Sequence, residues 1–285
     1  MDVAYYQHSG KCPLSGLLLC LLTGSLASAL LGAIYAYAIL YIPMDGLISF
    51  ILTGTFGLLS GIAIGKLMRR SHIRSLRAGR LCLLFCQSAG YYVSWAVWVF
   101  AVYARAGLNV SLIGILIPPV LWHAILQVNE TGVWSPGGKP LGGPLGGQLW
   151  IFWVAEAAFI FYFSWLGLAK LNGTFCERCG VWCNEHDAVA TLHPMQPDEL
   201  RTVLEQRDYE RLELATESIY ERIQLDLQQC PQCLDTCTVT GKLIQVTLKN
   251  GYLHKLIKSS VKQLLISRDE ATALRHLHLL KNSSG

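Results

Sequence analysis

The chain has 285 residues, a length that leaves room for about two domains. Hydrophobic residues make up 52% of it and charged residues 15%, whereas soluble globular proteins carry about 25% charged residues. This composition excludes a wholly soluble chain, and the net charge of +4 comes without the interleaved basic and aromatic residues typical of nucleic-acid binding. Because most acids follow residue 171, we expect a membrane region over 1–171 and a soluble domain over 172–285.

Four apolar stretches predict transmembrane helices, since about 20 such residues cross a bilayer. They cover residues 17–41, 47–68, 81–103 and 149–171. The first stretch is longer than the apolar part of a signal peptide, so we interpret it as a retained helix.

Small residues recur every four positions in the first two stretches, which places them on one face of each helix. They are Gly24, Ser28, Gly32 and Ala36 in the first and Gly57, Gly61 and Gly65 in the second. We expect these faces to pack the two helices together as a hairpin. Association of copies into a homo-oligomer through the same faces is the alternative.

A basic segment between the second and third stretches indicates the orientation. It contains Lys66, Arg69, Arg70, Arg74, Arg77 and Arg80 and no acid. Short loops rich in Lys and Arg stay in the cytoplasm, so we expect this loop and the N-terminus to be cytoplasmic.

The apolar segment 108–128 is interrupted by Pro118 and Pro119, which break or kink a helix. If the segment crosses the membrane, the chain has five spans and its C-terminal domain lies outside. If it re-enters or lies at the interface, the chain has four spans and this domain is cytoplasmic. We favour four, because the cysteine pairs that follow are typical of a reducing compartment.

Glu156 lies within the last predicted span, where a carboxylate is costly and marks a functional-site hypothesis. Arg105 and His123 are its expected partners. Two interpretations remain: a structural pair with the segment 104–130, or an ion pathway, proton pathway or ligand contact.

Two cysteine runs share one spacing: Cys176-x2-Cys179-x3-Cys183 and Cys230-x2-Cys233-x3-Cys237. A Cys-x2-Cys turn can place both sulfurs about 2.3 Å from one zinc ion, and two such pairs supply the four thiolates of a structural site. The predicted zinc ligands are therefore Cys176, Cys179, Cys230 and Cys233. Cys183, Cys237 and His186 are candidate additional ligands, and an iron–sulfur or binuclear centre and a dithiol redox pair are alternatives.

The soluble domain is expected to be α+β. Apolar residues at three- and four-residue steps predict helix over 198–229, inserted between the two cysteine runs, with a break near Asp208. Strands are expected at 238–248 and 261–266, followed by a helix that Ser267 caps. The predicted fold class is thus an all-α membrane bundle of four transmembrane helices plus a re-entrant or interfacial proline-broken helix, followed by a small α+β zinc-binding domain.

The layout resembles that of uncharacterised bacterial multi-pass membrane proteins with a C-terminal, zinc-ribbon-like cytoplasmic domain. The residues that carry the resemblance are Cys176-Glu-Arg-Cys179, Trp182, Trp153-x2-Glu156 and Cys230-Pro-Gln-Cys233. The resemblance implies an inner-membrane location and no known activity.

No catalytic motif is present, so we expect a protein that is not an enzyme. Its expected partners are the lipid bilayer and an unidentified protein, which binds the zinc-stabilised domain as an interaction or scaffold module. The alternatives are a small transporter or channel that uses Glu156 and the segment 108–128, and a membrane thiol redox protein.

Overall fold

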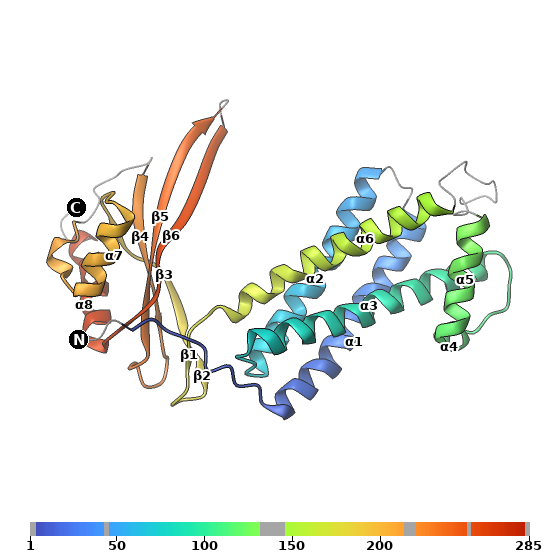
Figure 1. The fold of residues 1–285 in the computed structure, drawn as a ribbon, viewed down its shortest axis with the longest axis horizontal. Helices are drawn as coiled ribbons and strands as arrows, with labels where there is room; N and C mark the ends of the chain where they lie inside the picture. Colours follow the sequence, from blue (N-terminus) through green and yellow to red (C-terminus); the bar gives the residue numbers. More distant parts are fainter. Residues whose placement is uncertain (1–3, 43–45, 132–145, 214–220, 250–251, 283–285) are drawn as a thin grey trace. The chain divides into compact units, whose positions relative to one another are not determined.

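The computed structural model describes residues 4–42, 46–131, 146–213, 221–249 and 252–282 (Figure 1). The chain forms two compact units. A helical unit covers residues 10–172, and a sheet unit covers residues 173–285 together with the N-terminal residues up to Ser9. The described residues 4–9 therefore belong with the sheet unit, although the sequence analysis assigns them to the membrane region.

Four helices of the helical unit are long and apolar enough to cross a membrane, as the sequence predicts. They are α1 (Leu14–Tyr41), α2 (Gly46–Arg70), α3 (Leu76–Arg105) and α6 (Gly147–Trp165). The last of them continues into a 3-10 turn, η1 (Leu166–Leu171). Long apolar side chains stay exposed along these helices, as expected of surfaces that face lipid rather than water.

The proline-broken segment forms two short helices, α4 (Leu112–Ile115) and α5 (Pro118–Thr131). Pro118 occupies the first turn of α5, where its missing N–H costs no hydrogen bond. With 14 residues, α5 is shorter than the roughly 20 residues that a span requires. Both helices pack against α3, where Ile115 and Leu121 are buried.

Helices α1 and α2 pack against each other as predicted, but their small-residue faces mainly meet other helices. A Cβ on Gly32 of α1 would lie 2.3 Å from the carbonyl oxygen of Gly90 in α3. A Cβ on Gly61 of α2 would lie 2.3 Å from the carbonyl oxygen of Ser164 in α6. The face of α1 thus meets α3 and that of α2 meets α6, because those partners also carry small residues where the backbones approach. Both faces are covered within one chain.

The sheet unit contains a four-stranded antiparallel sheet in the order β3-β4-β5-β6 (Figure 1). Its strands are β3 (Asn184–Leu192), β4 (Glu221–Gln229), β5 (Cys237–Lys249) and β6 (Tyr252–Ile266). A separate hairpin pairs β1 (Phe175–Cys176) with β2 (Val181–Trp182). Tyr5 bridges to Leu264, so the N-terminal segment lies along one end of β6.

Helices α7 (Pro197–Gln206) and α8 (Arg268–Asn282) contribute to one apolar core with this sheet. Leu200 and Leu204 of α7 and Leu274 of α8 are buried in it. The sheet contributes alternate residues, as a strand with one face on a core must.

Among the described residues, the predicted helix over 198–229 is confirmed only up to Gln206 and is wrong at 221–229. The helix α7 ends at Gln206, where Arg207 adopts a left-handed φ of +62°, and residues 221–229 form the strand β4. Ile223 and Leu227 fit a helical four-residue step, but the same step is two strand periods, and the buried Leu225 between them fits only the strand.

One strand is longer than the sequence predicts, and another has no counterpart among the predicted strands. The predicted strand 261–266 is only the last part of β6. The sequence analysis gives no strand at the position of β3, because a bulge between His186 and Ala190 interrupts the alternation of its side chains. The amide of Ala188, which has a φ of +54°, donates to the buried carboxylate of Asp226 at 2.9 Å.

A substitution that adds one methyl group tests the close packing of α2 on α6. We expect Gly61→Ala to destabilise the bundle by about 1–3 kcal/mol, because the new Cβ would push against the backbone of Ser164. The measurement is the thermal unfolding midpoint in detergent. Gly147→Ala is the matched control, since a Cβ there meets nothing within 4 Å. An unchanged midpoint for Gly61→Ala would contradict this packing.

Candidate metal centre

The first cysteine pair lies on the turn of the β1–β2 hairpin. Cys176 ends β1, and its carbonyl accepts from the amide of Gly180 at 2.9 Å, which folds the turn back. Gly180 has a φ of +69°, a conformation that glycine adopts without a Cβ penalty. Cys179 precedes it, so this turn brings the two sulfurs of the pair to the same side.

The second pair lies between β4 and β5, on a turn that also has a left-handed residue directly after its second cysteine. Cys230 follows β4 directly, and its amide donates to the carbonyl of Thr236 at 2.9 Å. Leu234 follows Cys233 as Gly180 follows Cys179, and its φ is +60°. A leucine in this conformation costs about 1–2 kcal/mol and persists only where its surroundings hold it.

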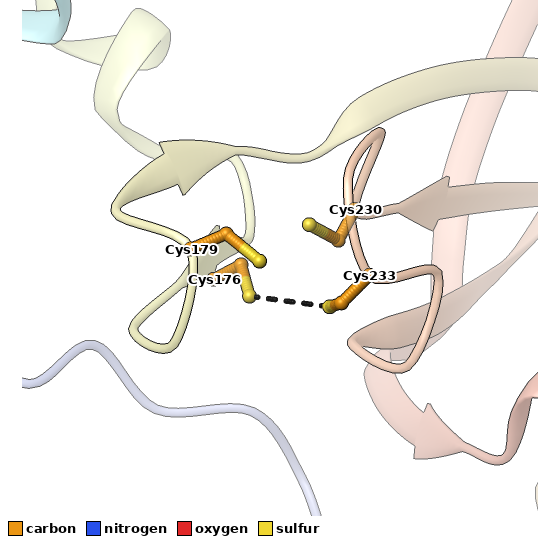
Figure 2. A group of neighbouring side chains, drawn as sticks. All are labelled: Cys176, Cys179, Cys230 and Cys233. Carbon is orange, nitrogen blue, oxygen red and sulfur yellow. Dashed lines mark hydrogen bonds between the residues drawn. The ribbon is translucent and has the colours of Figure 1, made fainter.

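The structure brings the four predicted cysteines together (Figure 2). Their sulfur atoms all lie within 4.8 Å of one another, and those of Cys176 and Cys233 are 3.7 Å apart. A tetrahedral ion with metal–sulfur bonds of about 2.3 Å has sulfurs separated by about 3.8 Å. The four thiols therefore fit a metal ion with little rearrangement. Among the described residues, these four cysteines form the group whose ligand atoms lie close enough together to hold a metal ion.

Hydrogen bonds favour the thiolate form at Cys176 and Cys233, whereas burial and the neighbouring thiols raise the pKa of Cys179 to about 12. Burial raises the pKa of Cys176, but donation from the Thr236 hydroxyl at 3.2 Å and from the Cys179 backbone amide outweighs it and lowers that pKa. The backbone amides of Asp235 and Thr236 lower the pKa of Cys233 to about 6. Metal binding at neutral pH then displaces fewer protons from these two sulfurs.

Cys183 and Cys237 lie outside the group of four. Burial raises the pKa of both thiols, that of Cys183 to about 12, so both are neutral at pH 7. The thiol of Cys237 donates to the carbonyl of Leu234 at 3.0 Å, and that of Cys183 donates to the carbonyl of Thr236 at 3.7 Å. Both thiols thus donate hydrogen bonds to carbonyls of the turn that carries Cys230 and Cys233. The spacing of the cysteines alone does not indicate this role.

His186, the remaining candidate ligand, is exposed on β3 opposite Leu227. It is not part of the metal-binding group.

Glu156 has a partner that the sequence analysis missed. Tyr35 of α1 donates to its carboxylate at 2.5 Å and also bonds to Thr53 of α2 at 2.9 Å. The expected partner Arg105 instead lies 4.0 Å above the ring of Tyr41 and donates to a carbonyl at the end of α1. The available signal was a tyrosine inside an apolar span, since a buried phenol normally finds a polar partner.

His123, the other expected partner, is exposed on α5. Its exposure places it on the outer side of that helix, because the inner side carries the buried Leu121 and Ala124.

The two classes of cysteine should behave differently when metal is measured. We expect Cys230→Ser to lose the bound metal, because it removes one of four ligands, and Cys237→Ala to keep it. The measurement is metal per chain by elemental analysis of protein purified without added metal. Loss of metal in Cys237→Ala together with a native circular dichroism spectrum would show that the ligand set is larger than four.

Comparison of the chain with protein-family models, with curated proteins and with solved structures finds no match.

Proposed function

We propose that this protein anchors a zinc-stabilised interaction domain to the cytoplasmic face of a bacterial inner membrane. The observation that supports this proposal most directly is that four cysteine sulfurs lie within 4.8 Å of one another. A four-thiolate site leaves no open coordination position, so the metal would stabilise the fold rather than activate a substrate. Zinc is the ion that prefers this ligand set, and a finding of iron with labile sulfide would contradict it.

Zinc would matter most to the sheet unit because that unit is small. Domains of about this size bury a limited core, and a structural metal adds its binding free energy to folding. The redox alternative is less well supported, because the sulfurs of Cys176 and Cys233, which lie 3.7 Å apart, belong to different turns and not to one Cys-x2-Cys pair.

The distribution of charge in the helical unit supports the cytoplasmic side. A Cβ on Gly16, in the first turn of α1, would touch Ser71 after α2, and one on Gly79 would touch Leu171 of η1. One end of the bundle therefore brings together the start of α1, the end of α2, the start of α3 and the end of η1. That end carries the basic segment, and the chain leaves the bundle there towards the sheet unit.

An exposed strand edge supports the interaction role. β6 is an edge strand, and over the described residues its free side pairs only near Leu264, with the N-terminal segment. Further along the strand, Leu256 and Ile257 are 61% and 53% exposed, between the exposed Lys255 and Lys258. Such an edge suits an extended partner segment that adds a strand and carries acidic and apolar side chains.

Reporter fusions test the orientation. A green fluorescent protein fused after residue 285 should fluoresce, because it would fold in the cytoplasm. Alkaline phosphatase fused after Thr131 should be active, because α5 would lie towards the outside. The opposite pattern at both positions would overturn the proposed topology.

Site-specific photo-crosslinking tests the strand edge. A photoreactive amino acid at Ile257 should give a discrete adduct in native membranes, and the same group at the exposed Thr202 of α7 should not. The double substitution Lys255→Glu and Lys258→Glu should reduce the adduct several-fold, because it reverses the charge offered to an acidic segment. Equal crosslinking at both positions, or an adduct insensitive to the charge reversal, would contradict the proposal.

A further inference from the structure

The helical unit contains a cavity of about 130 Å³ beside Glu156. Its walls come from α1, α3 and α6 and include Tyr35, Ser94, Trp95, Trp98, Trp153 and Glu156. No residue of the segment 108–128 lines it among the described residues. The cavity has no part in the metal centre, because all its lining residues belong to the helical unit.

Glu156 brings a carboxyl group to this cavity, and no basic side chain of the described residues pairs with it. Tyr35 donates one hydrogen bond to Oε1, which leaves the other carboxylate oxygen without a protein donor among the described residues. The expected partner Arg105 is held at Tyr41. A carboxyl group in apolar surroundings either keeps its proton or is paired with a cation, and a bound ammonium group would supply that cation.

Three indole rings make up much of the wall. The ring centroids of Trp95 and Trp153 are 4.9 Å apart and those of Trp95 and Trp98 are 5.8 Å apart, both in edge-to-face arrangements. The face of an indole attracts cations more strongly than any other side-chain ring. Indole faces combined with one carboxylate are the surroundings that recognise ammonium groups.

The same surroundings disfavour metal cations. Calcium and magnesium require six or more oxygen ligands, and this cavity offers one carboxylate and the hydroxyls of Tyr35 and Ser94. An organic cation makes no such demand, since its charge is spread over C–H and N–H groups that can lie against aromatic faces.

The volume sets the size of the ligand. A protein cavity of about 150 Å³ accommodates a benzene ring, so about 130 Å³ admits a group of only a few heavy atoms. A second cavity of about 270 Å³ shares Trp95 and Trp153 and is lined by aromatic and apolar residues without a charge. An alkyl substituent on the cation would find a matching surface there.

We propose that the cavity at Glu156 binds an alkylammonium group, with Glu156 as its counter-ion and Trp95, Trp98 and Trp153 as its aromatic walls. The group belongs either to a free amine or to the headgroup of an aminophospholipid. This site goes beyond the anchoring function and does not depend on it, because every residue involved lies in the helical unit.

Two binding measurements on the full chain distinguish the sources. In an uncharged detergent, radiolabelled choline and ethanolamine are titrated by equilibrium dialysis. In nanodiscs of phosphatidylglycerol with a minor fraction of phosphatidylethanolamine, the phosphatidylethanolamine retained after re-extraction is quantified by mass spectrometry. Saturable binding of the free amines supports a solute site, and selective retention of phosphatidylethanolamine supports a lipid site.

Three variants test the assigned roles. Glu156→Gln should lower the affinity at least tenfold, because it removes the charge and keeps the shape. Trp98→Leu should lower it several-fold, and Glu156→Asp should bind more tightly than Glu156→Gln. Glu130→Gln is the matched control, since it removes an exposed carboxylate on α5. Thermal unfolding of each variant shows whether the fold is intact.

The proposal is overturned if wild-type protein shows neither saturable amine binding nor lipid retention. It is also overturned if Glu156→Gln binds as well as wild type, or if potassium competes at the same concentration as choline. A loss of fold in Glu156→Gln shifts the decision to Trp98→Leu, whose unchanged affinity would equally overturn it.

Discussion

The sheet unit depends on the meeting of four sulfur atoms from two turns that are more than fifty residues apart in the chain. Thiolates this close repel one another strongly wherever water is excluded, so the arrangement is favourable only with a cation between them. Backbone amides favour the thiolate of Cys233, the Thr236 hydroxyl donates to the sulfur of Cys176, and the thiols of Cys183 and Cys237 donate to carbonyls of the second turn. Closure of the turns also determines where β4 ends and β5 begins.

The helical unit depends on a different constraint, the close approach of backbones where side chains are absent. Gly32 and Gly61 each place a helix against a carbonyl of its neighbour, a distance that admits no Cβ. Helices in lipid gain little from the hydrophobic effect, so such contacts and interhelical hydrogen bonds carry their association. The bonds from Ser60 to Gln87 and from Tyr35 to Glu156 are two of these.

These two units give the protein two separate sets of surfaces. The sheet unit offers an exposed strand edge at β6. The helical unit offers a charged and aromatic cavity among its helices. The first suits a macromolecular partner and the second a small cation, so the anchoring role does not account for all the polar groups of the chain.

The sequence by itself determined the four long apolar helices, the break at Pro118 and the four cysteines that converge. Each of these follows from a local property: the length of an apolar run, the missing amide of proline, or the turn that a Cys-x2-Cys spacing allows. Only the tertiary structure decided that residues 221–229 form a strand, because their apolar spacing fits both a helix and a sheet until neighbouring strands are present. It also decided which helix each glycine face meets and that Tyr35 reaches Glu156, 121 residues away. Such contacts depend on how whole elements pack, and no local pattern in this chain encodes that choice.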